Sequence, residues 1–316
     1  MTKLARTRAI ATMGVVCAAY VAAQTNAYVS SGAPQTVIDT RANAVLRSVQ
    51  LGISAFSPDG TKAYAIHGPS VSIIDVATET VTSTLALPVV GTVPLAFAAN
   101  GQTVYAAVPG AVQAISLNTG LVTSSVAIAG NPTSIAVTPD GTCAYVVCGV
   151  GSDLSLLPPG PVDPTNGRVY VIDTVSNSVV TSFTPQLPPI PVSPPVQPFN
   201  VYSGGTAVWI SPNGKWAYVG ITGVYDNGTN FVPSGGVAAI DIATNAILQT
   251  SVLGGAAGVV SFTADSTRAY VSMPFGWRNN NSGSGASFPG RFVGIFDTTD
   301  HNPIGVIDLG AADPNL

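Results

Sequence analysis

Five aspartates are the first residues of this chain that could carry chemistry, because each ends a short apolar segment. They are Asp39, Asp75, Asp173, Asp241 and Asp297. Carboxylates at repeated positions could serve acid–base catalysis or hold a metal ion. Their regular recurrence favours a structural role instead, because a carboxylate at the end of a strand accepts hydrogen bonds from the N–H groups of the following turn. We therefore predict that these aspartates cap turns.

Other catalytic or metal-binding side chains are scarce. The chain has two histidines, His67 and His301. Beyond the N-terminal segment it has two cysteines, Cys143 and Cys148, and residues five apart on an extended strand are too distant for a disulfide. We find no nucleophile elbow and no phosphate-binding glycine loop in the sequence. The sequence predicts no catalytic residue, no metal and no cofactor.

The composition favours strands and turns over helices. Apolar residues make up 46% of the 316 residues and charged residues only 8%, against roughly 25% charged in an average domain. Ser, Thr, Asn and Gly must therefore keep the exposed positions polar. The net charge of −4 disfavours a nucleic-acid partner, because an acidic surface repels phosphate.

The N-terminus has the pattern of a signal peptide. Lys3, Arg6 and Arg8 precede an apolar run over residues 9–23, and Val21 and Ala23 suit a cleavage site. We predict a signal peptide at 1–23 and a propeller domain at 24–316. An uncleaved N-terminal anchor is the alternative. The run is shorter than the roughly 20 residues that span a bilayer, and no later segment is a candidate, so we expect no membrane span in the mature chain.

Two sequence motifs, which we call phrases, recur along the chain. In one, a strand leads through a tight turn into a strand with tyrosine, as in 136–146, where Pro139-Asp140-Gly141 precedes Tyr145. Proline, aspartate and glycine supply the backbone conformations of a hairpin turn. In the other, an apolar strand ends in one of the five aspartates and a further strand follows. We name these strands A and B, then C and D.

The order A-B-C-D, repeated at about forty residues, is typical of the blades of a β-propeller. The chain begins with B-C-D and continues with five complete rounds. The predicted fold is therefore an all-β propeller of four-stranded antiparallel blades, five complete and one partial, in a six- or seven-bladed ring. Because no strand A follows the last strand D, we expect a C-terminal truncation.

The phrases are specific enough to suggest a family. Two segments resemble the YVTN family of β-propeller repeats: Val169-Tyr170-Val171-Ile172-Asp173-Thr174, followed by Asn177, and the tetrad Ala269-Tyr270-Val271-Ser272. The similarity covers nearly all of residues 27–310. The resemblance implies a bacterial or archaeal surface-layer or periplasmic protein, in which the repeat residues are structural and most members bind partners.

Four long insertions, 149–167, 183–204, 222–235 and 273–290, are predicted to lie on one face of the propeller. Three join strand B to C and one joins strand D to A, and these connections share a face. Long loops on one side of a rigid scaffold commonly carry binding sites. The candidate ligand-binding residues are Tyr225, Asp226, Phe231, Phe275, Trp277, Arg278, Phe288 and Arg291.

Aromatic planes beside amides suit sugar rings or peptide surfaces, although the same aromatics could instead pin the loops to the blades. We expect an exported, non-catalytic protein that is periplasmic, secreted or on the cell surface and recognises a protein or glycan through the loop face. The alternative is an enzyme resembling the propeller lactonases or the propeller subunits of quinone-dependent dehydrogenases.

Overall fold

The computed structural model describes residues 16–17, 26–29, 35–39, 44–50, 53–57, 61–67, 69–89, 93–98, 100–149, 167–189, 200–226, 231–253, 257–273, 276–278, 286–288 and 292–308. Within these ranges the chain is all-β, without a helix, so no helix there is long and apolar enough to cross a membrane. The chain divides into two compact units, Met1–Pro88 and Val89–Leu316, and each is described by itself.

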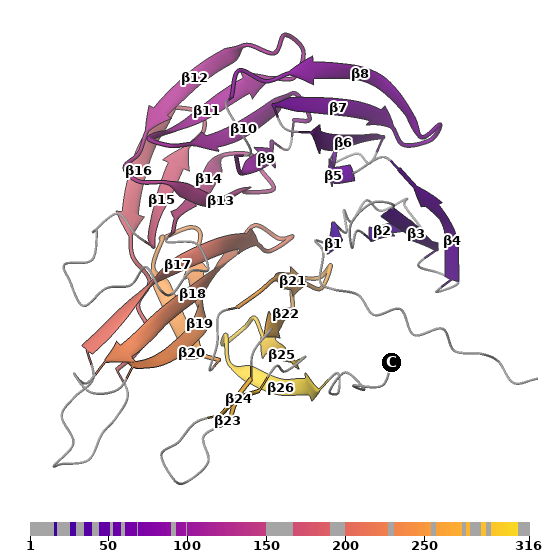
Figure 1. Cartoon of the computed structure of the whole chain (residues 1–316). Helices are drawn as coiled ribbons and strands as arrows, with labels where there is room; N and C mark the ends of the chain where they lie inside the picture. The colour runs from indigo at the N-terminus through magenta and orange to yellow at the C-terminus, as the bar shows by residue number, and fades with distance from the viewer. Residues whose placement is uncertain are drawn as a thin grey trace, which may run out of the picture. The chain divides into compact units, whose positions relative to one another are not determined.

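The described strands form six four-stranded antiparallel sheets, which we name blades 1 to 6 in chain order (Figure 1). The first unit holds two of them. Blade 1 comprises β1 (Val16–Cys17), β2 (Asn26–Val29), β3 (Gln35–Asp39) and β4 (Ala44–Val49). Blade 2 comprises β5 (Ile53–Phe56), β6 (Lys62–His67), β7 (Ser70–Asp75) and β8 (Thr80–Ala86).

The second unit holds the other four blades. Blade 3 comprises β9 (Leu95–Phe97), β10 (Thr103–Val108), β11 (Ala111–Ser116) and β12 (Val122–Ala127). Blade 4 comprises β13 (Pro132–Val137), β14 (Cys143–Cys148), β15 (Arg168–Asp173) and β16 (Ser178–Phe183). Blade 5 comprises β17 (Asn200–Ile210), β18 (Trp216–Asp226), β19 (Phe231–Asp241) and β20 (Ile247–Val252). Blade 6 comprises β21 (Val260–Phe262), β22 (Arg268–Met273), β25 (Phe292–Asp297) and β26 (Pro303–Asp308).

Four-stranded antiparallel blades in chain order confirm the predicted fold class. Blade 1 differs in one strand from the predicted order B-C-D. The two-residue β1 pairs with β2, with Val16 opposite Val29 and Cys17 opposite Tyr28, and takes the place of strand A. β1 lies within the segment predicted as a signal peptide, and the cleavage itself stays a prediction.

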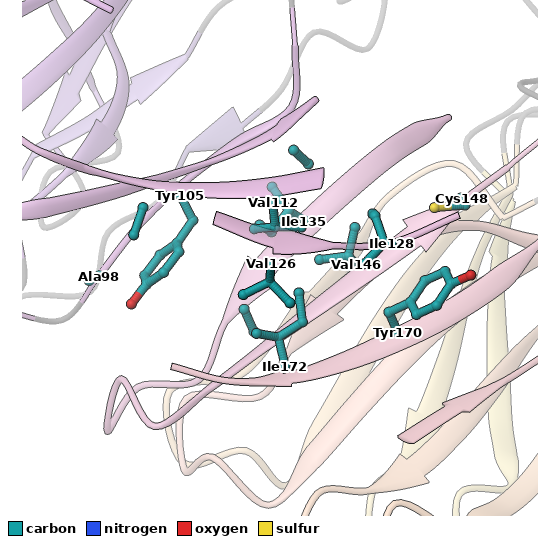
Figure 2. Packing of buried hydrophobic residues seen from close by; sticks show 13 residues of the cluster. Ala98, Tyr105, Val112, Val126, Ile128, Ile135, Val146, Cys148, Tyr170 and Ile172 are labelled. Atoms are coloured by element: carbon teal, nitrogen blue, oxygen red, sulfur yellow. The ribbon is translucent and has the colours of Figure 1, made fainter. Parts of the chain in front are cut away.

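The cores lie between neighbouring blades, because successive residues of a strand point to opposite faces of its sheet. On β14, Ala144, Val146 and Cys148 belong to the cluster that joins blade 4 to blade 3. Tyr145 and Val147 belong to the cluster that joins blade 4 to blade 5. Figure 2 shows the first cluster, in which residues of both blades interdigitate. Blade 4 therefore buries both of its faces.

A buried hydroxyl closes the turn between strands A and B. Ser57, Thr138, Ser211 and Thr263 each accept a hydrogen bond from the backbone N–H five residues later, at 2.9 to 3.0 Å. In three of these turns the hydroxyl also donates to the side chain two residues on, as Ser211 does to Asn213 at 2.7 Å. The Ser-Pro-Asn-Gly type of sequence thus encodes a complete local hydrogen-bond network.

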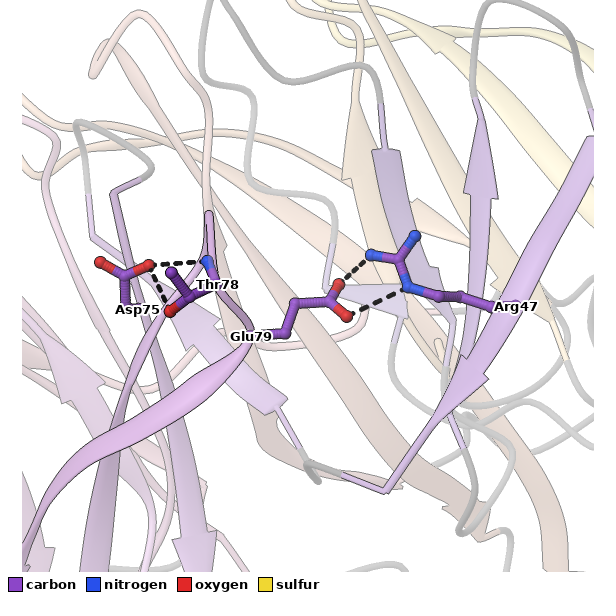
Figure 3. A network of polar contacts seen from close by, with 4 residues as sticks. All are labelled: Arg47, Asp75, Thr78 and Glu79. Carbon is purple, nitrogen blue, oxygen red and sulfur yellow. Dashed lines mark hydrogen bonds and ion pairs between the residues drawn. The ribbon is translucent and has the colours of Figure 1, made fainter.

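The repeated aspartates cap the turns between strands C and D, as predicted. Asp75, Asp173, Asp241 and Asp297 each accept a backbone N–H of the following turn, at 2.7 to 2.9 Å. Figure 3 shows Asp75 with Thr78. The side chain of Asp39 lies outside the described residues.

The fourth residue after each of these aspartates has positive φ, between 54° and 59°. This turn residue is Glu79 in blade 2, Asn177 in blade 4, Asn245 in blade 5 and His301 in blade 6. Asparagine and histidine tolerate this left-handed region better than most residues, which explains why asparagine recurs in the phrase. The matching position in blade 3 is Gly120, with φ of 73°.

The same turn residues bind the preceding blade. Glu79 forms an ion pair with Arg47 of β4 in the first unit (Figure 3). In the second unit, Asn177 accepts from Ser124 at 2.6 Å and Asn245 accepts from the Tyr145 hydroxyl at 2.5 Å. The Tyr218 hydroxyl lies 2.9 Å from Nδ1 of His301. Each turn therefore fastens its blade to the one before it.

Every strand D, the outer edge of its blade, carries a β-bulge. The register shift leaves one residue without a partner on strand C: Leu46, Thr82, Thr123, Val180, Leu248 or Ile304. All large apolar side chains that are exposed among the described residues lie in strand D or in the turn that leads to it. Bulges twist an edge strand and hinder its pairing with another chain.

Replacing Ser211 with alanine should test the A–B turn network. The variant leaves the half-buried N–H of Trp216 without its acceptor, which costs about 1 kcal/mol or more. Urea unfolding should show this loss. Ser125→Ala on β12, at an exposed position, should change stability by less than about 0.5 kcal/mol. Equal effects of the two variants would contradict the assignment.

The turn carboxylates should make the fold acid-sensitive. Hydrogen bonds from the Thr263 hydroxyl and from Thr267 lower the pKa of Asp265 to about 2, and turn N–H or hydroxyl donors lower the pKa of Asp75, Asp173 and Asp297. The unfolded chain therefore binds more protons below about pH 4. The contribution of these carboxylates to stability should be complete above that pH and should fall towards pH 2. Asp265→Asn should show a shallower fall in urea titrations over this range.

Candidate functional site

Blade 5 is longer than the other blades on one side. Strands β17, β18 and β19 each have eleven residues, whereas β14 and β15 of blade 4 have six. β20 pairs with β19 only from Gly236 onwards. Residues 200–205, 221–226 and 231–235 therefore continue as a three-stranded sheet beyond the body of the blade. We name these residues the extended ribbon.

The prediction that 222–235 forms a loop is wrong for most of its residues. Residues 222–226 continue β18, and residues 231–235 begin β19. Only 227–230 lie outside the described residues. Strand-forming residues on both sides of Asn227-Gly228 are a hairpin signal, so the sequence contained the evidence. The insertion predicted at 183–204 likewise ends in strand, because β17 begins at Asn200.

Three candidate residues meet at the tip of the ribbon. Asp226 of β18 is the backbone partner of Phe231 of β19, and Tyr225 is the partner of Val232. On its other side, Asp226 is paired with Asn200 of β17. The register therefore places Tyr225, Asp226 and Phe231 within two adjacent rungs of one sheet.

A second hairpin carries three further candidates. β23 (Gly276–Arg278) pairs with β24 (Ala286–Phe288), so Trp277 and Arg278 lie in one strand and Phe288 in the other. The sequence predicted a loop at 273–290, and these six residues are strand instead. The β23–β24 hairpin joins strand B to strand C of blade 6, the same connection that the ribbon tip makes in blade 5. Phe275 and Arg291 lie outside the described residues.

Glycines at the root hold the ribbon against blade 4. The Gly205 N–H donates to the Gly167 carbonyl at 2.9 Å. A Cβ on Gly167 would lie 2.2 Å from the Gly204 Cα, and a Cβ on Gly149 would lie 2.9 Å from the Gly205 carbonyl oxygen. Only glycine allows backbones to approach this closely. Sequence reasoning missed these contacts, because glycine is frequent along the whole chain.

The connection from blade 4 to blade 5 packs along the ribbon. The Leu187 N–H donates to the Ser203 hydroxyl oxygen at 3.0 Å, and that hydroxyl lies 3.3 Å from Oε1 of Gln186. Leu187 is buried, and its Cδ2 would lie 3.1 Å from a Cβ on Gly236. The ribbon is thus braced along β17 and at the base of β19.

Two buried polar atoms at this root have no hydrogen-bond partner. They are Nε of Arg168 and Oγ1 of Thr206. Each follows directly after one of the two glycines, Gly167 and Gly205, whose backbones are joined by the hydrogen bond. Buried polar atoms are nearly always satisfied by protein, water or ligand. Thr206 Oγ1 faces Gly220 and the core between blades 5 and 6, whereas Arg168 belongs to blade 4, so the two atoms do not form one site.

The two cysteines are not bonded to each other, in agreement with the sequence. Cys143 and Cys148 are free thiols at opposite ends of β14. Burial raises the pKa of Cys148 to about 11, so its thiol stays protonated and unreactive at neutral pH. Among the described residues no three His, Cys, Asp or Glu side chains gather as metal ligands.

The glycine contact predicts a large effect of one methyl group. In Gly167→Ala, the positive φ of 71° and the overlap with Gly204 act together, which should cost about 3–5 kcal/mol. Gly110→Ala is the matched control, because its φ is 80° but nothing lies within 4 Å of the new Cβ. This control should lose only about 1–2 kcal/mol. Urea unfolding of both variants measures the difference, and similar losses would show that the close contact is absent.

Comparison with known proteins supports the fold. The sequence matches no family model and no curated protein. Among solved structures 1141 chains match, so the fold is too widespread to indicate one activity. One of them is the hydrazine synthase of Kuenenia stuttgartiensis, at a TM-score of 0.55 and 21% identity, over 82% of this chain and 66% of that chain. Similarity at this identity shows the β-propeller fold alone. The resemblance to the YVTN repeats stays a prediction.

Proposed function

We propose that this chain is an exported, non-catalytic binding protein whose extended ribbon and β23–β24 hairpin recognise a protein or a glycan. One observation carries the proposal: the three strands of the ribbon continue for about five residues beyond the point at which β20 stops pairing. Ordering each of these residues costs backbone entropy of roughly 1–2 kcal/mol. The blade fold does not need this extra length, since blade 4 is complete without it.

The residue types of the ribbon and hairpin support contact with a ligand. Tyr225, Phe231, Trp277 and Phe288 provide large, stiff apolar surfaces, which are the side chains that dominate binding hot spots. Asp226 and Arg278 are the two charged residues of these described segments, and they have opposite signs. A nearly neutral aromatic surface suits sugar rings or the side chains of a partner protein.

The rigid root supports the same proposal. A binding surface performs best when its elements are ordered before the ligand arrives. The glycine contacts at Gly167 and Gly205 and the bond between Leu187 and Ser203 supply that order.

Export is part of the proposal because of the basic and apolar N-terminal residues. Once residues 1–23 are removed, the chain has eight basic and fifteen acidic residues, because three of its eleven basic residues lie in that segment. The net charge of the mature chain is then −7, from eight minus fifteen. Mass spectrometry of the mature N-terminus tests the cleavage independently of binding.

Shortening the ribbon should abolish binding without unfolding the blades. Thr222 and Gly235 are backbone partners, so replacing 223–234 with Asn-Gly closes β18 and β19 through a two-residue turn. The immobilised chain is exposed to the solubilised envelope fraction of the producing cell in biolayer interferometry. We expect wild type to bind and the shortened variant to bind at least about tenfold more weakly, at an unchanged Tm within a few degrees.

Two treatments of the envelope fraction distinguish the ligand classes. Protease digestion removes a protein ligand, and periodate oxidation removes a glycan. Trp277→Ala tests the second hairpin, and Asn118→Ala, on the C–D turn of blade 3, is the control away from both hairpins. Equal binding by wild type, the shortened variant and Trp277→Ala would refute the proposal.

A further inference from the structure

His301 is a buried histidine at the junction between blades 5 and 6. It lies in the turn between β25 and β26, and only 5% of its surface is exposed. Its Nδ1 is 2.9 Å from the hydroxyl of Tyr218, which belongs to β18 of blade 5. A neutral imidazole that carries its proton on Nε2 accepts this hydroxyl proton at Nδ1. The turn of blade 6 is thus fastened to blade 5 through an uncharged ring.

Aromatic rings surround this contact. The imidazole stands edge-on to Trp216 with ring centres 4.8 Å apart, and Tyr218 stands edge-on to Phe262 of β21 at 5.1 Å. Tyr218 itself is 1% exposed. With only 5% of its surface exposed, the imidazole has little access to water, so a positive charge formed on it would be poorly solvated.

The preceding junction has the same geometry without a titratable turn residue. There the Tyr145 hydroxyl of blade 4 donates to Oδ1 of Asn245 in the turn of blade 5. Asn245 and His301 have nearly the same backbone conformation, with φ of 58° and 59°. Blade 6 therefore carries histidine where blade 5 carries asparagine, and only the histidine responds to pH near neutrality.

The charged groups around His301 are three aspartates and one arginine. Asp297 and Asp300 lie in its own turn, and Asp241 ends β19 of blade 5; all three favour the protonated imidazole. Arg268, at the start of β22, acts on Asp297. Burial opposes the aspartates and outweighs them, so the pKa of His301 lies below 6.5. Protonation therefore weakens the folded contact.

We propose that His301 is an acid-sensitive latch, which holds the turn of blade 6 against Tyr218 when neutral and releases it when protonated. Protonated Nδ1 becomes a donor, so the Tyr218 hydroxyl can then only accept from it, and the positive charge on the buried ring is what favours release. In the closed state the turn of blade 6 lies against Tyr218, and in the open state it is released. His301 binds the proton more tightly in the open state than in the closed state. The latch is therefore firm above about pH 7 and loosens as the pH falls below 6.5. The inference does not depend on the proposed binding function.

Hydrogen exchange tests the latch at the level of single blades. Exchange of peptides covering 214–219 and 292–308 is measured at pH 7.5, 6.5 and 5.5 and corrected for intrinsic rates. One coupled proton increases opening by up to tenfold per pH unit, so these peptides should lose protection below pH 6.5. The matched peptides of the blade 4–5 junction, 143–148 and 241–247, should not. Equal pH dependence at both junctions would overturn the latch.

His301→Asn is the decisive variant, because asparagine holds the matching position in blade 5 and tolerates positive φ. This variant should remove the pH dependence of hydrogen exchange in the peptides covering 214–219 and 292–308. His67→Asn removes the other histidine, which is exposed, and should leave the dependence intact. An NMR titration of wild type gives an independent measurement. A His301 pKa at or above 6.5, or pH dependence that persists in His301→Asn, would exclude the mechanism.

Discussion

Within each compact unit, the structure depends on the burial of apolar blade faces against the neighbouring blade. A four-stranded sheet alone would leave both faces in water, and only stacking removes that surface. Strand B shows the requirement most clearly, because alternate residues of β14 enter two different cores. Polar contacts then fix how the blades meet. In the second unit, a tyrosine or serine side chain of one blade forms a hydrogen bond with the turn residue of the next blade. The apolar contact therefore provides the stability, and these hydrogen bonds fix the position of one blade on the next.

The repeated parts of the fold could be predicted from the sequence, because each repeat contains the residues that form its own turns and strands. Thr138-Pro139-Asp140-Gly141 contains both the hydroxyl and the carboxylate that close the turn. The aspartates at the ends of strand C were predicted as caps for the same reason. The two-residue β1 was missed, since its residues also fit the apolar core of a signal peptide. A segment that satisfies two patterns cannot be assigned by pattern alone.

The candidate site was harder to predict, because it depends on contacts between segments far apart in the sequence. The sequence predicted loops between strands B and C for its residues, but Tyr225, Asp226 and Phe231 lie in β18 and β19, and Trp277, Arg278 and Phe288 lie in a hairpin. The hairpin signal at Asn227-Gly228 was available, but the backbone contact between Gly167 and Gly204 was not. Such a contact is possible because both residues lack side chains, and a pair of glycines far apart in the sequence forms no pattern that identifies it. The role of His301 also emerges only when its turn is compared with the turn of blade 5.

The bulges on the outer strands have a consequence for the conditions that the protein can tolerate. Many proteins protect exposed edge strands with lysine or other charges, and salt screens such charges within about 3 Å at 1 M ionic strength. Strands β12, β16 and β20 contain no charged residue. Their bulges, and not charges, therefore hinder pairing with another chain. A bulge results from one extra residue in the strand and does not depend on charge, so added ions do not weaken it. These edges should therefore stay equally protected in fresh water and in brine.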